Sequence, residues 1–330
     1  MRAVVVTRPG EPEVLAVQDV PEPVAGPGQL AVQVVAAGVN RADLLQRAGR
    51  YPVPPGAPRW PGLEISGTVT ALGPGLGAGP GGRPWAVGDR VAALLPGGGY
   101  AERAVTDAAL TLPVPDDVDL ADAAGLPEAL ATVLSNLGPA WLAPGRTVLV
   151  HGGSGGVGSV AVQLAHALGA RVVSTAGGPE RVGRVHDLGA DVALDHREPD
   201  LVGRVHAATD GHGVDAVLDI LGAAALDDNI AMLAPDGLLA IIGLQRGRRG
   251  ELDLNAVMSK RLTLTGTTLR ARPAEQKAAI MADVRERGWS LVVSGAVRPV
   301  VHARLPFEQA AEAHRLVEAG EAFGKVLLVP

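Results

Sequence analysis

A short apolar strand, a run of glycines and an amphipathic helix follow one another between residues 147 and 168. Residues 147–150 (TVLV) are apolar or β-branched, which indicates a buried strand. The glycine-rich segment 152–158 (GGSGGVG) comes next, and residues 159–168 carry apolar side chains at helical spacing. Glycines let the backbone approach a pyrophosphate closely, and a helix N-terminus offers unpaired N–H groups. This order predicts the phosphate-binding unit of a nucleotide-binding βαβ fold.

The segments around this unit alternate between single apolar strands and helical patterns. That alternation is typical of a doubly wound parallel sheet with helices on both faces, an α/β architecture of the Rossmann type. The expected strands are 147–151, 171–175, 191–194, 214–220, 237–242 and 261–267, and the expected helices are 158–168, 179–188, 198–208 and 223–234.

The first 120 residues have a different texture, with β-branched runs broken by proline and glycine. They predict a small barrel-like or strongly bent antiparallel sheet, with a flexible loop at 73–83. The C-terminal part predicts a helix, a strand, a second helix and a last strand that return to this first domain. We therefore expect a nucleotide domain at 122–271 and a discontinuous, mainly β substrate domain at 1–121 and 272–330. The individual elements expected in the substrate domain are strands at 3–7, 29–35, 63–71, 90–95, 101–105, 297–302 and 325–329, with helices at 41–47, 273–290 and 306–319.

Composition excludes several classes of protein. The chain of 330 residues contains no cysteine, which excludes disulfides, thiolate metal ligands and a cysteine nucleophile. The formal net charge is −6 and a basic cluster is confined to residues 246–249, which argues against a nucleic-acid partner. No apolar run is long enough for a transmembrane helix, and the first residues are typical of a strand rather than a signal peptide. We expect a cytoplasmic protein with no membrane and no nucleic-acid partner.

The tip of the second strand indicates which nucleotide binds. NAD sites usually place an aspartate or glutamate here to hold the ribose 2′-hydroxyl. This chain instead has Thr175 and Gly177, with Arg181 and His196 nearby. Cationic groups without a carboxylate favour a 2′-phosphate and hence NADPH. The carboxylate of Glu180, in contrast, favours NAD.

Several long blocks of sequence resemble one known family. They include residues 39–52 (VNRADLLQRAGRYP), 62–67 (GLEISG), 94–100 (LLPGGGY), 127–129 (PEA), 219–222 (DILG) and the pair Gly324–Lys325. The chain resembles the medium-chain dehydrogenase/reductase superfamily, and within it the zinc-free NADPH:quinone oxidoreductases of the tumour-suppressor-inducible subgroup. The resemblance covers essentially the whole chain and implies a GroES-like substrate domain beside the Rossmann domain.

Zinc-dependent members of that superfamily carry a Gly-His-Glu motif where this chain has Gly62-Leu63-Glu64. A leucine replaces the metal-binding histidine, and no thiolate is available to help hold zinc. We therefore expect no metal site. Oxidation of an alcohol, which needs a Lewis acid, becomes unfavourable, and hydride transfer from a nicotinamide to an electrophilic acceptor remains.

By resemblance, the catalytic residues are Tyr51, Asn40 and Asp43. Tyr51 could stack on a flat acceptor and donate a hydrogen bond, or it could simply pack on neighbouring prolines. Asn40 and Asp43 could instead cap the helix at 41–47. Thr132 matches a position near the nicotinamide but could equally be an ordinary helix residue. The expected cofactor site comprises Thr132, Gly153, Ser154, Gly155, Gly156, Val157, Thr175, Gly177, Arg181, His196, Leu221, Gly243, Leu244, Leu269, Arg270, Gly324 and Lys325.

The sequence thus predicts NADPH-dependent reduction of quinones or related conjugated carbonyls without a metal. Two alternatives stay open: reduction of enones or enoyl thioesters, and a nucleotide-binding protein without catalysis. The strand at 261–267 should lie at the edge of the nucleotide sheet, where an exposed edge invites pairing with a second copy. The family precedent is a homodimer.

Overall fold

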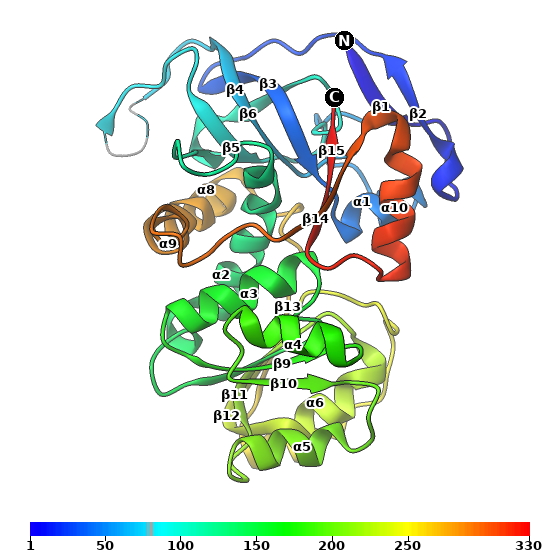
Figure 1. Ribbon diagram of the computed structural model, residues 1–330, viewed down its shortest axis with the longest axis vertical. Coiled ribbons are helices and arrows are strands. Elements are labelled where there is room, and N and C mark those ends of the chain that lie inside the picture. The colour runs from blue at the N-terminus through cyan, green and yellow to red at the C-terminus, as the bar shows by residue number, and fades with distance from the viewer. Residues whose placement is uncertain (78, 80–81) are drawn as a thin grey trace. The chain divides into compact units, whose positions relative to one another are not determined.

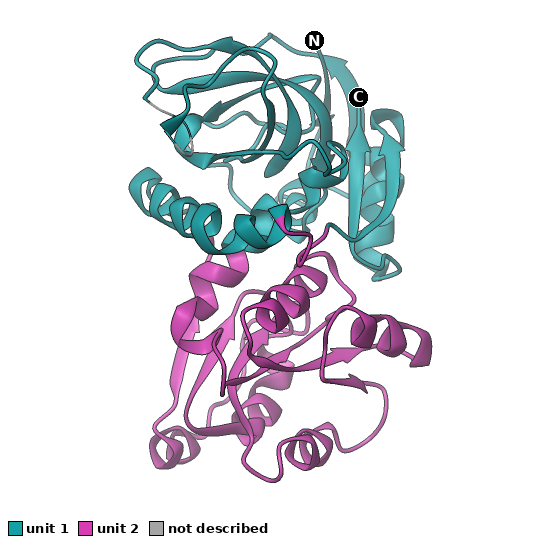
Figure 2. Cartoon of the chain, turned by 60° about the vertical axis from the view of Figure 1, so that its left-hand side comes forward, with its two compact units in different colours: residues 1–131, 270–293, 299–330 teal, residues 132–269, 294–298 magenta. Residues whose placement is uncertain are grey.

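The computed structural model describes residues 1–77, 79 and 82–330, which form two compact units (Figure 2). Unit 1 contains residues 1–131, 270–293 and 299–330, and unit 2 contains residues 132–269 and 294–298. The domain boundaries expected at 121/122 and 271/272 stay a prediction. Part of the loop expected at 73–83 lies outside the described residues, at positions 78, 80 and 81.

Unit 2 is built on a sheet whose strands all run parallel (Figure 1). The order is β10-β9-β8-β11-β12-β13, so the chain reverses its direction of travel across the sheet between β8 and β11. Ligands of doubly wound folds bind at the carboxyl ends of the strands beside this reversal. The predicted α/β fold is confirmed. The strands are β8 (Thr147–Val150), β9 (Arg171–Ala176), β10 (Val192–Asp195), β11 (Val214–Asp219), β12 (Leu233–Ile241) and β13 (Thr263–Gly266).

The helices of unit 2 follow the predicted pattern with one clear correction. The helix expected at 223–234 is shorter, because Leu233 pairs with Val214 and already belongs to β12. No described helix is long and apolar enough to cross a membrane. The helices are α3 (Gly156–Ala167), α4 (Pro179–Asp187), α5 (Leu201–Ala208), α6 (Leu226–Met232) and α7 (Leu254–Lys260), and α2 (Pro127–Trp141) spans the division between the units.

Unit 1 is built on a mainly antiparallel sheet of order β14-β15-β3-β4-β5-β7, with β6 also paired to β3. In Figure 1 the red β15 runs beside the blue β3, since Leu327 and Leu328 pair with Gly38 and Ala37. The C-terminal strands therefore complete the sheet of unit 1, as predicted. The strands are β1 (Arg2–Val6), β2 (Leu15–Asp19), β3 (Gln29–Gly38), β4 (Glu64–Leu72), β5 (Arg90–Leu94), β6 (Arg103–Asp107), β7 (Thr111–Pro113), β14 (Val301–Pro306) and β15 (Lys325–Val329).

Two C-terminal predictions need correction. The expected helix 273–290 is α8 (Ala274–Asp283), a π-helical segment (Val284–Gly288) and α9 (Trp289–Val293). The strand expected at 297–302 was wrong, because β14 begins only at Val301. Backbone groups of Arg298 instead bond the side-chain amide of Gln163 at 3.0 and 3.1 Å, which holds this segment as a loop. The remaining helices, α1 (Arg41–Arg47) and α10 (Ala310–Ala319), lie near their predicted positions.

Candidate active site

The glycine loop between β8 and α3 is packed too tightly to accept side chains at two positions. A Cβ on Gly153 would collide with Ser174 Oγ, and one on Gly158 would collide with the carbonyl oxygen of Gly152. Gly155 is the N-cap of α3 and supplies no side-chain cap. The first N–H groups of α3 therefore have no acceptor within the helix or on its cap residue. This cradle fits the phosphates of a dinucleotide.

Thr175 supports this loop from the neighbouring strand. Its hydroxyl oxygen accepts a hydrogen bond from the Gly152 N–H at 3.2 Å and lies 3.2 Å from His151 Nδ1. His151 Nε2 lies 2.7 Å from Asn229 Oδ1, an acceptor, so the ring carries its proton on Nε2. Burial lowers the pKa of His151 and keeps the ring neutral. His151 is thus a buried, satisfied residue, and a direct cofactor contact by Thr175 stays a prediction.

A cationic turn lies at the carboxyl ends of β9 and β10. A Cβ on Gly177 would lie 3.0 Å from Arg197 Nη2 and 3.1 Å from His196 Nε2, so both side chains face this turn. The carboxylate of Asp195 accepts the backbone N–H groups of Gly178 and Arg197, which fixes the turn. Gly177 and His196 were predicted from the sequence as cofactor residues, whereas Arg197 was not.

In unit 1, the predicted residues Asn40 and Asp43 form a capping box at the start of α1. Asp43 accepts the Asn40 N–H and the Gly62 N–H, each at 2.9 Å, and it is fully buried. Burial raises the pKa of Asp43 to about 6, although these hydrogen bonds oppose the shift. The structure therefore gives Asp43 the capping role that the sequence left open.

A buried network supports α1 from behind. Arg47 Nη1 donates to His314 Nδ1 at 3.4 Å, and His314 Nε2 donates to the Tyr100 hydroxyl at 3.2 Å. The Tyr100 hydroxyl in turn bonds Asp43. Burial, aided by the charge of Arg47, lowers the pKa of His314 to about 3, so the imidazole is neutral. This network holds α1, and with it Asn40, in place.

The Asn40 side chain belongs to a buried ionic cluster. Its Nδ2 donates to Glu64 Oε1 at 2.9 Å, and its Oδ1 accepts from Lys325 Nζ at 2.7 Å. Lys325 also forms a salt bridge with Glu64, and both side chains are at most 3% exposed. The Lys325 ammonium, predicted to contact the cofactor, is engaged within unit 1 by two partners; its contact with a cofactor stays a prediction.

Tyr51 lies beside Arg270. The guanidinium carbon of Arg270 is 5.5 Å from the centre of the tyrosine ring, a cation–π arrangement. Arg270 Nε donates to the Pro96 carbonyl at 2.7 Å and Nη1 donates to Gln46 Oε1 at 2.8 Å. Arg270 is 5% exposed, so this cation is held rigidly against the partly buried tyrosine.

The other predicted cofactor residues divide between the units. Thr132, Arg181, Leu221, Gly243, Leu244 and Leu269 belong to unit 2 with the glycine loop, while Arg270, Gly324 and Lys325 belong to unit 1. Leu221 follows the end of β11, where its N–H bonds Asp219 at 2.9 Å. Leu244 is exposed, and Leu269 is buried. Gly324 has a φ of 87°, and a Cβ there would collide with the Val300 carbonyl oxygen.

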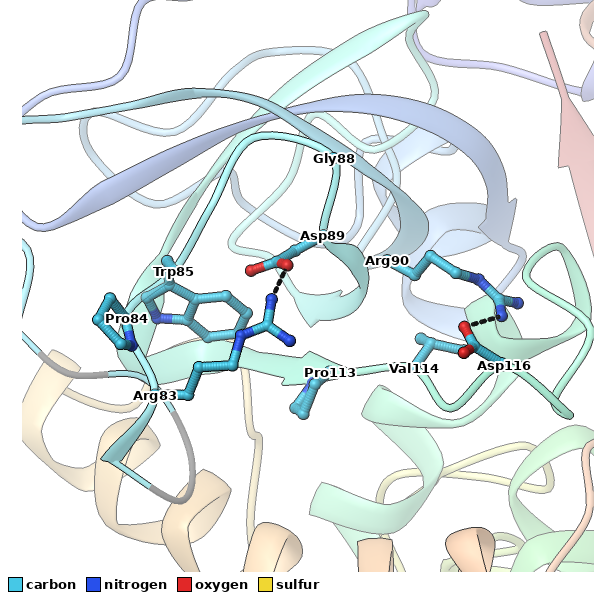
Figure 3. Close-up of a pocket in the computed structure, with 9 residues that line it drawn as sticks. All are labelled: Arg83, Pro84, Trp85, Gly88, Asp89, Arg90, Pro113, Val114 and Asp116. Carbon is cyan, nitrogen blue, oxygen red and sulfur yellow. Dashed lines mark hydrogen bonds and ion pairs between the residues drawn. The ribbon is translucent and has the colours of Figure 1, made fainter.

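A surface groove in unit 1 is lined by none of these residues (Figure 3). Its arginines are already paired, Arg83 with Asp89 and Arg90 with Asp116. It therefore offers no free charge for an anionic ligand. Among the described residues, no group of three or more histidine or acidic side chains is placed to hold a metal ion.

Comparison with known proteins identifies the family. A model of the alcohol dehydrogenase GroES-like domain matches residues 26–116, and a model of the zinc-binding dehydrogenases matches residues 156–283. The rat quinone oxidoreductase is 32% identical over the whole chain and 98% of its own length.

Solved structures agree on the fold. Mycobacterial Rv1454c, described as a complex with NADPH, is 36% identical with a TM-score of 0.86, and both chains are fully covered. A protein described as an NAD-dependent alcohol dehydrogenase is 32% identical with a TM-score of 0.87, again over both full chains. The subgroup suggested by the sequence stays a prediction. The chain is an enzyme, an oxidoreductase that belongs to the quinone oxidoreductase family of the medium-chain dehydrogenase/reductase superfamily.

Proposed function

We propose that this enzyme reduces quinones with NADPH and without a catalytic metal. The observation that carries the proposal is that the carboxylate of Glu64 is already bound by other groups of the protein. Its carboxylate is held by Lys325, by Asn40 and by the Glu128 N–H, and Leu63 replaces the histidine of the zinc-binding motif. Because these groups occupy Glu64 and the sequence holds no cysteine, the described residues of this corner offer no ligand set that suits a catalytic metal. The acceptor must therefore be electrophilic by itself, as a quinone is.

The glycine cradle and the cationic turn support NADPH. When bound, NADPH supplies a hydride, that is, two electrons and one proton. The cradle of unit 2 would hold the pyrophosphate through backbone N–H groups, and Arg197 with His196 would hold the 2′-phosphate. Rv1454c, with NADPH bound, is in keeping with this assignment. The fold alone does not distinguish NADPH from NAD as the cofactor, since the alcohol dehydrogenase described as NAD-dependent has the same fold.

The cluster around Tyr51 supports a flat acceptor. An aromatic ring backed by a rigid guanidinium can stack on a planar conjugated molecule, and the tyrosine hydroxyl can donate a hydrogen bond to a carbonyl oxygen. Asn40, Glu64 and Lys325 would keep this part of unit 1 rigid. In this proposal Asn40 and Asp43 are positioning residues, and Tyr51 contacts the substrate.

A substrate panel tests the proposal. NADPH oxidation by the purified enzyme is measured with 1,2- and 1,4-quinones, simple enones and crotonyl thioesters. We expect the quinones to give the highest kcat/KM. Faster turnover of the thioesters would replace the quinone assignment with the enoyl alternative, and binding of NADPH without turnover of any acceptor would indicate a non-catalytic protein.

We also propose a homodimer through unit 2. The strand β13 lies at the end of the sheet order, and in the described part of the chain its ladder partner is β12 alone. On α7, Leu254 and Met258 are 64% and 76% exposed, and their spacing places both on one face. An open strand edge beside exposed apolar side chains suits pairing with a second copy. Sedimentation should give twice the mass of one chain at micromolar concentration; the mass of a single chain would refute the proposal.

A further inference from the structure

Arg270 is a buried cation whose hydrogen-bond partners are all neutral. Its Nε donates to the Pro96 carbonyl oxygen at 2.7 Å and its Nη1 donates to Gln46 Oε1 at 2.8 Å. Among the described residues, no carboxylate forms an ion pair with this guanidinium, which stays protonated in proteins. A buried charge without a counter-charge is costly, and it favours any anionic group that reaches it.

The remaining terminal nitrogen of Arg270 is a free donor. Nη2 is buried and has no hydrogen-bond partner in the part of the chain that the structure describes. The two bonds to Pro96 and Gln46 fix the direction in which this nitrogen points. Buried donors in native proteins are nearly always paired, so an unpaired one that is held rigidly points to a ligand.

The segment facing Nη2 is built without side chains. A Cβ on Gly97 would lie 3.0 Å from Nη2, tighter than almost all real Cβ contacts, and the φ of 151° at Gly97 is one that other residues rarely adopt. The next residue, Gly98, also has a positive φ, of 89°. The chain therefore places no side chain against this nitrogen from the side of Gly97.

Tyr51 places the free donor beside the expected acceptor site. The guanidinium carbon of Arg270 lies 5.5 Å from the centre of the Tyr51 ring. A planar molecule that stacks on Tyr51, as proposed above, brings its oxygen atoms close to the edge of the guanidinium. The arrangement thus combines an aromatic face with a cationic donor, which suits a flat molecule bearing an oxygen that becomes negative.

The nearby carboxylate of Asp43 does not neutralise Arg270. Its two oxygens accept the backbone N–H groups of Asn40 and Gly62, each at 2.9 Å. The charge of Arg270 is therefore left for another anion.

We propose that Arg270 is a catalytic residue that donates a hydrogen bond from Nη2 to a carbonyl oxygen of the quinone and stabilises the negative charge that develops there. This role rests on the function proposed above. The hydride adds two electrons and one proton to the quinone and gives the hydroquinone monoanion. Arg270 keeps its own proton, and the monoanion takes its second proton from water, which leaves hydroxide.

The variant Arg270→Gln tests this role in turnover. It removes the charge and the free donor, whose interaction strengthens as the oxygen becomes negative. We expect kcat with 1,4-benzoquinone to fall about 10²–10³-fold with KM almost unchanged, the result for a donor that acts mainly in the transition state. Arg270→Lys keeps the charge and should recover part of this loss. The NADPH dissociation constant, measured by fluorescence, should stay that of the wild type in both variants.

The matched control is Arg8→Gln. Arg8 is an exposed arginine of unit 1 that follows β1, and this variant should have the kcat and KM of the wild type. Circular dichroism confirms that each variant is folded. A wild-type kcat in Arg270→Gln, or a loss of NADPH affinity with kcat unchanged, would overturn the role and assign Arg270 to the fold or to the cofactor.

A second measurement needs neither turnover nor a variant. The anion of 4-nitrophenol mimics the hydroquinone monoanion and differs in colour from the neutral phenol. Bound to the wild type with NADP⁺, 4-nitrophenol should ionise at a pH about 1–3 lower than in solution, because a cation lies beside its oxygen. This shift should be missing in Arg270→Gln and kept in Arg8→Gln.

The outcomes separate this role from the function on which it rests. Ionisation of 4-nitrophenol as in solution, in the presence of the wild type, would overturn the anion site at Arg270 even if quinones are reduced. A shifted ionisation in an enzyme that reduces no quinone would leave the anion site standing and overturn the quinone reductase function.

Discussion

Replacing Lys325 by methionine lowers the free energy of unfolding by about 3–5 kcal/mol. The substitution leaves the Glu64 carboxylate buried without its cation, and it leaves Asn40 Oδ1 without its donor. A buried charge that has lost its partner is costly because neither water nor another group solvates it. Urea unfolding followed by circular dichroism measures the effect.

Two controls accompany this variant. Adding Glu64→Gln to Lys325→Met removes the uncompensated charge and should restore a large part of the lost stability. Arg315→Met breaks solvent-screened surface ion pairs with Glu13 and Glu312, and it should leave the free energy of unfolding nearly unchanged. If Lys325→Met is as stable as Arg315→Met but binds the cofactor more weakly, Lys325 contributes to cofactor binding. The ionic cluster of Asn40, Glu64 and Lys325 then does not stabilise unit 1.

Replacing Arg197 by alanine weakens binding of NADPH about 10- to 100-fold and leaves binding of NADH almost unchanged. Charge-assisted hydrogen bonds contribute about 1.5–3 kcal/mol, and 1.4 kcal/mol is a factor of ten in affinity. Arg197 faces the glycine turn beside His196, where the 2′-phosphate is proposed to lie. Fluorescence titration with both cofactors measures the two dissociation constants.

Arg171→Ala is the matched control for this prediction. Arg171 is an exposed arginine at the amino end of β9, the strand that pairs with β10, whereas Arg197 follows the carboxyl end of β10. It should bind both cofactors as the wild type does. Equal losses for NADPH and NADH in Arg197→Ala would mean that Arg197 supports the fold of the turn rather than the phosphate.

Local patterns made the nucleotide unit predictable. The strand, glycine run and helix at residues 147–168 are adjacent in the chain, so their spacing alone indicated their joint structure. Arg197 was missed because its position depends on strand register. Asp195 pairs with Ala176, so the residues after each strand end, including Arg197 and Gly177, meet across the sheet. Parallel pairing of neighbouring strands was the available signal.

The buried ionic cluster around Glu64 and Lys325 in unit 1 could not be predicted from the sequence in the same way. Glu64, Glu128 and Lys325 lie on β4, α2 and β15, and only the folded sheet brings them together. Glu64 was noted for a motif and Glu128 as part of the block 127–129, but neither pattern shows that the Glu64 carboxylate meets Lys325 and the Glu128 N–H. The capping box of Asn40 and Asp43, in contrast, is a local feature and was foreseen as one alternative.

Reduction of a quinone in a single turnover by metal-stripped enzyme tests the central claim most directly. Chelator-treated enzyme loaded with one equivalent of NADPH is mixed anaerobically with 1,4-benzoquinone, and the loss of nicotinamide absorbance is followed. We expect the same rate constant before and after chelation, with no gain on adding zinc. A rate that disappears with chelation and returns with zinc would contradict it.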